Sequence, residues 1–403
     1  MASTALSNDA TDTNSTIAAS ENVIESPTTL TSPDKLLSSA GIQKCKWSEL
    51  LSGEVFWRDQ CRFLKEHGYT LRARYQPDWK PSWLGTSKKF YECEDSEILL
   101  NPNVMDASRN DKSLVMLKCL HRKHNHLEIL LGKVLSRVNP QCFPGNHCVP
   151  FLDVLEPPDC EYVIVVMPYL VRWDIVPFET IGEIIEFFRQ IFEGLLFMHN
   201  LNIAHEDIKS ENILADAVSL FSYPPHPSLS YHMKRDFSGW TKVVHSRTKC
   251  PIIYHLIDFD FSNFFDSKTG ASEQPPFGGT RNCPEVWQPD APPCNPFLVD
   301  VFCMGNVVRE FLFDKKGSIS GPKRGFEFMR ELVDDMMNSD PLKRPSMKEV
   351  VERYEVMYNG LSEWKLRSPV VTVGKRFKLR KAAVHWTKQL VRMARGIPAI
   401  PRI

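Results

Sequence analysis

The first gaps in this sequence concern membranes and disulfides. No apolar run approaches the ~18 residues of a membrane-spanning helix, and no apolar segment stands near the N-terminus. The eleven cysteines include no Cys-x-x-Cys pair, which disfavours a disulfide framework. We therefore expect an intracellular protein, cytoplasmic or nuclear, whose cysteines are mostly small core residues in a reducing compartment.

An excess of either charge is also missing, because 49 Lys and Arg balance 49 Asp and Glu. Without a global field to attract an anionic polymer, no nucleic-acid partner is expected. Residues 1–40 are poor in aromatic side chains and have no Lys or Arg before Lys35, which predicts a disordered tail and disfavours a mitochondrial presequence. The 403 residues, 42% of them hydrophobic, suffice for two or three structural units.

Two kinds of site find little support in the sequence. The chain has no Gly-x-Ser-x-Gly nucleophile elbow, so a hydrolase of that type is not expected. His121, His124 and His126 cluster without a defined set of cysteine or carboxylate ligands. A solvated turn is the favoured interpretation of these histidines, and a metal site is the weaker one.

One loop carries a specific chemical pattern. Asp207 is followed two residues later by Lys209 and three residues further by Asn212. At this spacing the carboxylate can meet an acceptor hydroxyl, the lysine a transferring phosphoryl group and the amide a magnesium ion. Residues 204–214, Ala-His-Glu-Asp-Ile-Lys-Ser-Glu-Asn-Ile-Leu, resemble the protein-kinase catalytic loop His-Arg-Asp-Leu-Lys-x-x-Asn. The motif alone leaves a charged surface loop as the alternative.

Four more stretches follow in the order expected of a protein kinase. They resemble the Asp-Phe-Gly segment, the end of the activation segment, the helix that begins Asp-x-x-x-x-Gly and the late arginine motif, and they occupy residues 258–260, 279–285, 300–305 and 340–345. The resemblance implies ATP and Mg²⁺ or Mn²⁺, with Asn212 and Asp258 as the metal ligands. It also implies an ion pair between Glu285 and Arg344, and support of the catalytic loop by Asp300.

A lysine strand and a hinge precede these motifs. Residues 113–118 form a short apolar run that ends in Lys118 and reads as a strand. The resemblance implies that this lysine pairs with the nucleotide phosphates and with Glu128 on the next helix. The resemblance also implies that Met167 lies beside the adenine, and that the Pro168 carbonyl and the Leu170 N–H form hydrogen bonds with it. The fold it implies is α+β, a bilobal protein-kinase-like fold with a small β-rich N-lobe and a larger α-helical C-lobe.

Three departures from the kinase pattern bear on activity. No Gly-x-Gly-x-x-Gly precedes Lys118, so fewer backbone amides can approach the phosphates. Asp260 replaces the glycine of Asp-Phe-Gly and adds a carboxylate near the metal site. Glu206 replaces the arginine that grips an activation-loop phosphate in many kinases, and a carboxylate repels phosphate.

The chain divides into five predicted segments. After the tail come a family-specific N-terminal extension at 41–95, the N-lobe at 96–168, the C-lobe at 169–362 with an insertion at about 216–250, and a basic tail at 363–403. The aromatic extension is expected to pack on the N-lobe, with a partner-binding surface as the alternative. Together with the insertion, Val104-Met105-Asp106-Ala107 and Ala204-His205, it resembles divergent kinase-like proteins of basidiomycete fungi.

The basic tail has eleven Lys and Arg residues against one acid, Glu363. Apolar residues are interleaved with the charges, which permits an amphipathic helix that binds an acidic partner or an anionic surface. A solvated tail is the alternative.

The sequence therefore predicts a protein kinase that transfers the γ-phosphoryl group of ATP to Ser or Thr hydroxyls of a protein substrate. Asp207 and Lys209 would be its catalytic residues. The opposing prediction is a pseudokinase that acts as a binding scaffold. A small-molecule phosphotransferase is disfavoured, because Thr280 and the pair of Glu285 with Arg344 belong to the protein-substrate apparatus of the family.

Overall fold

The structure, a computed structural model, describes nine stretches of the chain. They are residues 48–98, 101–138, 143–227, 233–267, 271–274, 283–287, 292–314, 321–375 and 379–402. The predicted disordered tail at 1–40 lies outside them, as does Thr280. Among the described residues, no helix is both long and apolar enough to cross a membrane.

The first part of the described chain is built on a five-stranded antiparallel sheet in the order β1-β2-β3-β5-β4. Its strands are β1 (Tyr69–Leu71), β2 (Val104–Arg109), β3 (Leu114–His121), β4 (Asp153–Leu155) and β5 (Tyr162–Pro168). Strand β1 lies within the residues predicted as an extension, and Leu71 pairs with Ala107 of β2. The extension thus supplies one strand of the sheet, and residues 72–103 connect that strand to β2. We call residues 48–168 the sheet lobe.

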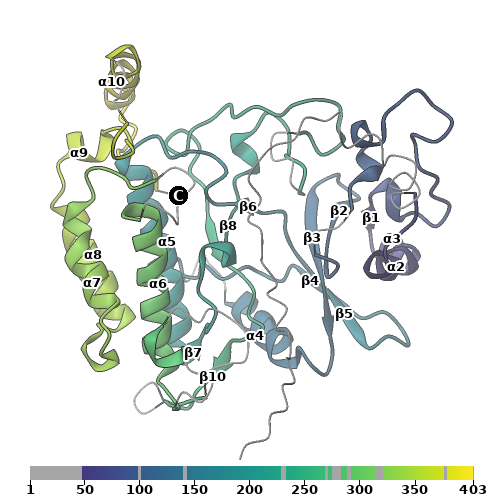
Figure 1. Cartoon of the computed structure of the whole chain (residues 1–403), viewed down its shortest axis with the longest axis horizontal. Helices are drawn as coiled ribbons and strands as arrows, with labels where there is room; N and C mark the ends of the chain where they lie inside the picture. Colours follow the sequence, from purple (N-terminus) through teal and green to yellow (C-terminus); the bar gives the residue numbers. More distant parts are fainter. Residues whose placement is uncertain are drawn as a thin grey trace, which may run out of the picture. The chain divides into compact units, whose positions relative to one another are not determined.

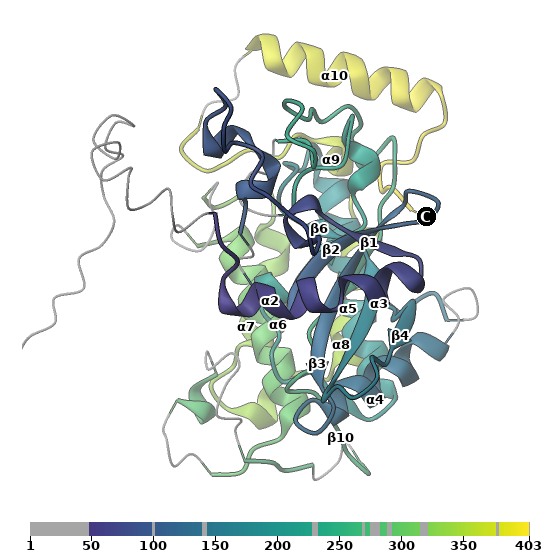
Figure 2. The same ribbon diagram turned by 90° about the vertical axis from the view of Figure 1, so that its right-hand side faces the viewer.

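The two faces of the sheet have different coverings. Because side chains alternate along a strand, Val115 and Leu117 of β3 face one side and Lys118 the other. Helices α2 (Ser52–Asp59) and α3 (Cys61–Glu66) cover the first side, where Trp57 is fully buried against the same apolar cluster (Figure 2). On the second side, helix α4 (His126–Arg137) packs Ile129 against a smaller cluster that includes Leu120 and Val163.

The second part of the described chain, residues 169–402, carries the longest helices, and we call it the helical lobe. Its helices are α5 (Ile181–Asn200), α6 (Pro296–Leu312), α7 (Arg330–Met336), α8 (Met347–Asn359), α9 (Glu363–Arg367) and α10 (Leu379–Ala394) (Figure 1). Helix α5 begins where the Thr180 side chain accepts a hydrogen bond from the Glu183 N–H, as an N-cap does. Its apolar face is fully buried, which confirms the predicted core helix before the catalytic loop; that face consists of Ile184, Phe188, Ile191, Leu195 and Met198.

The helical lobe also contains two small sheets. Strands β6 (Val171–Arg172), β8 (Ile213–Ala215) and β9 (Tyr254–Leu256) form one, and β7 (Ile203–Ala204) pairs with β10 (Asn263–Phe264) in the other. The chain is thus a mixed α+β structure, with an antiparallel sheet first and helices later. This arrangement is consistent with a kinase-like bilobal fold.

The C-terminal residues pack on the helical lobe through polar contacts. Lys388 and Arg392 of α10 both reach the carboxylate of Glu179, and His385 lies 2.8 Å from the carbonyl oxygen of Arg367. The outward side of α10 carries Leu379, Val384, Leu390 and Val391. The basic tail therefore contains the helix that its sequence permits, with polar side chains on the packed side.

Candidate functional site

A single cavity of about 390 Å³ brings together residues from both lobes. Its lining includes every residue that the sequence assigned to cofactor binding, namely Lys118, Glu128, Met167, Pro168, Leu170, Asn212 and Asp258. Most charged members come from β3, α4 and the loops before β8 and after β9, and Arg172 of β6 is the exception. The hinge residues at the end of β5 and directly after it are mainly apolar. The cavity therefore has a charged end and an apolar hinge end. Such a division suits a ligand with a flat apolar part and an anionic part.

Lys118 lies at the centre of the charged end. Its Nζ atom is 2.6 Å from Oε1 of Glu128 and 2.6 Å from Oδ1 of Asp258. Burial lowers the pKa of Lys118, but the two carboxylates raise it further, so the net shift is upward and the lysine stays charged. A fixed cation between two acids can attract the phosphates of a ligand, while Asp258, which is 37% exposed, can turn to a metal.

The residues of the loop that resembles a kinase catalytic loop form a second cluster next to the cavity. Oδ2 of Asp207 accepts hydrogen bonds from Nζ of Lys209 at 2.5 Å and from Nδ2 of Asn212 at 2.8 Å. The same amide nitrogen of Asn212 donates to the backbone oxygen of Asp207 at 2.9 Å. Because Asn212 uses its nitrogen in this way, its side-chain oxygen is the atom left to face a cation.

Asp300 holds the loop in place from behind. This fully buried carboxylate accepts from the backbone N–H of His205 at 2.7 Å and from that of Glu206 at 2.8 Å. Apolar side chains also anchor the loop, because Ile208, between Asp207 and Lys209, and Ile213, directly after Asn212, are both buried. The support that the resemblance implied for Asp300 is thus present in the structure.

Two residues at the site have unusual backbone angles. Glu206 has φ +61° and Asp258 has φ +68°, values that cost a non-glycine residue about 1–3 kcal/mol. The hydrogen bond to Asp300 fixes the first residue, and the ion pair with Lys118 fixes the second. Strain of this kind persists only where surrounding contacts determine it, which is a feature of functional loops.

Asp260, which was expected near the metal site, turns away from the cavity. It is not part of the cavity lining, and its Oδ1 accepts a hydrogen bond from Nδ2 of Asn125, just before α4. Within the described stretches, no group of three or more His, Cys, Asp or Glu side chains is arranged to hold a metal by itself. A site made of Asn212 and Asp258 fits Mg²⁺ only together with phosphate oxygens, which is a common arrangement for this ion.

Glu285, at the end of the stretch that resembles an activation segment, and Arg344 also meet as the resemblance implied. Arg344 donates from Nη1 to Oε1 of Glu285 at 2.5 Å and from Nη2 to Oε2 at 2.8 Å. The guanidinium is buried and also donates to the carbonyl oxygen of Leu298 on α6. A two-bond pair of this kind fixes residues 283–287 on the helical lobe.

Two groups of cavity residues had no assignment from the sequence. The apolar walls contributed by Val104, Met116, Leu214 and Ile257 lie beside assigned residues, and strand alternation around Lys118 and Asn212 would have indicated them. His226 and Pro227 come from the insertion and also line the cavity. The local sequence does not indicate that these two residues line the cavity, because contacts with residues distant in the sequence determine their position.

Comparison with known proteins gives a limited match. No protein-family profile matches the chain. A serine/threonine-protein kinase of Oryza sativa subsp. japonica, SAPK4, is 28% identical over 155 residues, which are 36% of this chain and 38% of that kinase. The match thus spans well under half of the kinase's own length. This distant, partial similarity to a Ser/Thr protein kinase suggests membership of the protein kinase superfamily.

Proposed function

We propose that the chain is an ATP-dependent protein kinase that phosphorylates Ser or Thr hydroxyls, with slow turnover. The observation that carries the proposal is the joint position of two clusters. Lys118, Glu128 and Asp258 meet at the charged end of the cavity, and Asp207, Lys209 and Asn212 meet beside it. The partial similarity to a serine/threonine-protein kinase supports the same reaction class.

The residues fit the groups that this reaction needs. Asp258 and the side-chain oxygen of Asn212 would hold Mg²⁺, and Lys118 would hold phosphate oxygens of ATP. The metal, when bound, neutralises charge on the phosphates. Asp207 would orient the substrate hydroxyl and take its proton. Lys209, whose Nζ lies 2.5 Å from Oδ2 of Asp207, would meet the developing phosphoryl charge.

The hinge would receive the adenine. Pro168 has no N–H, so only its carbonyl oxygen can take part, and Leu170 offers a backbone N–H two residues later. Met167, partly buried behind them, limits the depth of the cavity. We further propose that the chain belongs with divergent kinase-like proteins of basidiomycete fungi, because the long connection before β2 and the insertion after β8 are both present.

The test compares the wild-type protein with Asp207→Asn. Purified protein is incubated with Mg·ATP and a generic protein substrate, and phosphate transfer is measured. We expect the variant to lose about 100-fold or more of the activity, the usual effect of removing a general base. Its thermal unfolding midpoint should stay nearly unchanged, because an Asn oxygen still accepts from Lys209. Equal activity of the two proteins would refute the assignment of this loop.

The scaffold alternative has its own outcome in the same experiment. Calorimetry with Mg·ATP, run alongside Asp258→Asn, reports binding apart from transfer. If the wild type binds no nucleotide at millimolar concentration and transfers no phosphate, the chain is a binding scaffold and the kinase proposal is wrong.

A further inference from the structure

The segment between β8 and β9 folds into a hairpin that reaches the sheet lobe. Its described residues 221–227 and 233–243 are joined by antiparallel bridges between Phe221 and Val243 and between Pro225 and Lys234. We call these residues the inserted hairpin. Its base is tied to the helical lobe, where Arg247 donates to the carbonyl oxygen of Trp173 at 2.7 Å. The end of the hairpin that leads into β9 is therefore fixed to the helical lobe.

An ion pair clamps the inserted hairpin to the sheet. Nε of Arg235 donates to Oδ2 of Asp106 on β2 at 2.7 Å, and the carboxylate of Asp106 is almost fully buried. Oδ1 of Asp106 lies 2.9 Å from Nε of Arg72, directly after β1. The guanidinium groups of Arg72 and Arg235 hold the pKa of Asp106 below its usual value, although burial acts to raise it.

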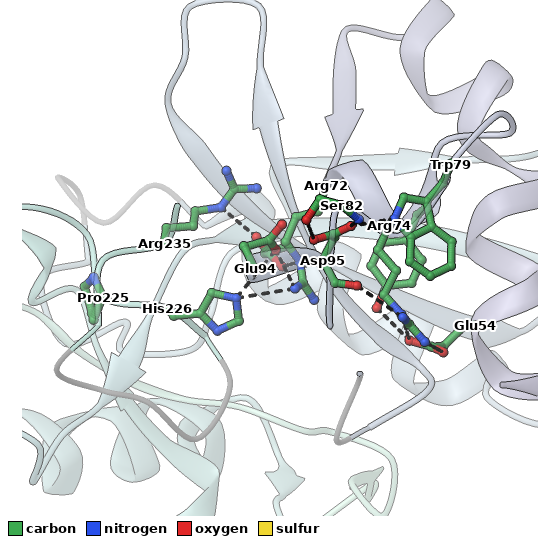
Figure 3. A network of polar contacts seen from close by, with 12 residues as sticks. Glu54, Arg72, Arg74, Trp79, Ser82, Glu94, Asp95, Pro225, His226 and Arg235 are labelled. Carbon is green, nitrogen blue, oxygen red and sulfur yellow. Dashed lines mark hydrogen bonds and ion pairs between the residues drawn. The ribbon is translucent and has the colours of Figure 1, made fainter. Parts of the chain in front are cut away.

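A second contact lies beside this pair. Nε2 of His226 is 3.3 Å from Nη1 of Arg72 and 3.7 Å from Oε1 of Glu94, which itself accepts from Arg72 at 2.8 Å. Figure 3 shows these side chains converging from the inserted hairpin and from the β1–β2 connection. The clamp thus joins residues more than 120 positions apart, since Asp106 and Arg235 differ by 129.

The connection that receives the hairpin is itself fixed to the sheet lobe. Arg74 forms a two-bond pair with Glu54 of α2, with both distances at 2.9 Å and both side chains buried. The carboxylate of Asp95 accepts from Trp79 and from Ser82 within the connection (Figure 3). The inserted hairpin is therefore held against a rigid platform and not against a mobile loop.

This clamp places His226 and Pro227 in the wall of the cavity at its hinge end. The carbonyl oxygen of the preceding residue, Pro225, accepts a hydrogen bond from the Tyr169 hydroxyl at 2.7 Å. Tyr169 stands between Pro168 and Leu170, the two residues that offer hinge hydrogen bonds. The hairpin therefore adjoins the part of the cavity that would hold a base and sugar. Lys118 and Asp258, by contrast, form the end that would hold phosphates.

We propose that the inserted hairpin is the wall that closes the cavity over the base and sugar of a nucleotide, with Arg235 as its positioning residue. This inference rests on the proposed function, because it takes the ligand to be an adenine nucleotide. A covering loop rich in glycine is missing before Lys118, and His226 with Pro227 supplies a side-chain surface instead. The wall contributes to affinity through the nucleoside part of the ligand and leaves the phosphates to the charged end.

The test measures three ligands, adenosine, ADP and Mg·ATP, by calorimetry against the full-length protein. Arg235→Gln should weaken all three by a similar factor of about ten, because the loss of one charge-assisted hydrogen bond lowers the fraction of molecules with the wall in place by about that factor. Arg72 still pairs with Asp106 in this variant, so no buried charge is left alone. Lys118→Met should weaken ADP and Mg·ATP but leave adenosine unchanged. Lys242→Gln, which removes the same charge from an exposed site of the hairpin, should change none of the three.

Two further measurements separate a moved wall from a damaged fold. Arg235→Lys keeps the ion pair and should recover most of the affinity. Hydrogen exchange in residues 221–227 and 233–243 should quicken in Arg235→Gln and not in Lys242→Gln. The His226 N–H, which donates to the Met233 carbonyl, is included in this expectation. If Arg235→Gln binds all three ligands with unchanged affinity, or loses affinity for Mg·ATP alone, the proposal that the inserted hairpin covers the base and sugar is wrong. Absence of all nucleotide binding in the wild type overturns the proposed function itself.

Discussion

Glu206 shows how burial changes the meaning of a residue. A carboxylate at this position was expected to repel phosphate. In the structure the side chain is 8% exposed, and burial, with Glu273 and Asp300 nearby, raises its pKa to about 9. At neutral pH the group is therefore a protonated acid without charge. Its Oε1 atom has no hydrogen-bond partner in the described part of the chain.

The raised pKa of Glu206 predicts a pH-dependent stability. The folded protein keeps this proton up to about pH 9, while the unfolded chain releases it near the ordinary pKa of 4.5, so unfolding releases a proton between these values. Stability then falls as pH rises through this window. Glu206→Gln removes the effect and should raise the free energy of unfolding at about pH 8 by about 1 kcal/mol or more, with a smaller gain near pH 5.

Denaturant unfolding of both proteins at the two pH values measures this difference. Glu211→Gln, five residues further along the same loop and exposed, is the matched control and should show no such trend. A gain from Glu206→Gln that is equal at both pH values would mean that position 206 is ionised in the folded protein.

The same residue argues against activation of the protein by phosphorylation. A phosphate on a Ser or Thr between Asp258 and Glu285 finds no arginine at position 206, and a neutral acid offers little attraction. We therefore predict equal activity before and after phosphatase treatment. Phosphate transfer by the two preparations is compared directly, and a several-fold loss after treatment would show that another cation reads the phosphate.

Helix α4 depends on a glycine that the kinase pattern does not require. Glu128 must sit at the start of this helix to reach Lys118, and Gly132 lies one turn further along. A Cβ atom at position 132 would overlap the ring of Phe151. The glycine lets the helix approach the chain before β4 closely, and this approach sets the position of Glu128.

Gly132→Ala should therefore be destabilising, although alanine normally stabilises a helix by about 1 kcal/mol relative to glycine. We predict a loss of about 1–3 kcal/mol from overpacking, with weaker Mg·ATP binding because Glu128 is displaced from Lys118. Thermal unfolding and calorimetry provide the two readouts. Gly145→Ala is the control, because its nearest neighbours lie at 3.8 Å. An unchanged or raised midpoint for Gly132→Ala would show that Phe151 can move aside.

Over the whole molecule, the ion pair of Lys118 with Asp258 and the ion pair of Arg235 with Asp106 are among the contacts that join the two lobes. Lys118 comes from the sheet lobe and Asp258 from the helical lobe, and they meet at 2.6 Å. Under the proposed function, a metal held by Asp258 would leave Lys118 to the phosphates, and the two lobes would stay linked through the ligand. Without a glycine-rich loop, charge and metal must supply most of the phosphate binding.

We therefore predict ATP binding that is weak and strictly dependent on Mg²⁺ or Mn²⁺. Ligand binding to the folded state raises the unfolding midpoint by mass action, so a thermal-shift titration with ATP, with and without the divalent ion, is the measurement. The shift should vanish with a chelator and in Asp258→Asn. Tight binding without metal would show that other groups hold the phosphates.

The sequence by itself determined much of the chemistry around the cavity. Asp207, Lys209 and Asn212 lie within six residues, so their spacing alone brings them together on one loop. The apolar run before Lys118 and the helical spacing of α5 indicated a strand and a core helix, because alternation and the helical repeat are local properties. The order of the motifs then indicated an α+β chain with its sheet first. The roles of these residues in catalysis stay predictions.

Tertiary structure alone decided the parts that depend on distant contacts. It placed β1 beside β2, Gly132 against Phe151, and the inserted hairpin on Asp106 with His226 and Pro227 in the cavity wall. It also made Glu206 a neutral acid, because burial and two nearby acids outweigh its normal ionisation. Local patterns record which residue types recur along the chain. Burial, close packing and ion pairs between residues more than 100 positions apart arise only when the folded chain brings those residues together.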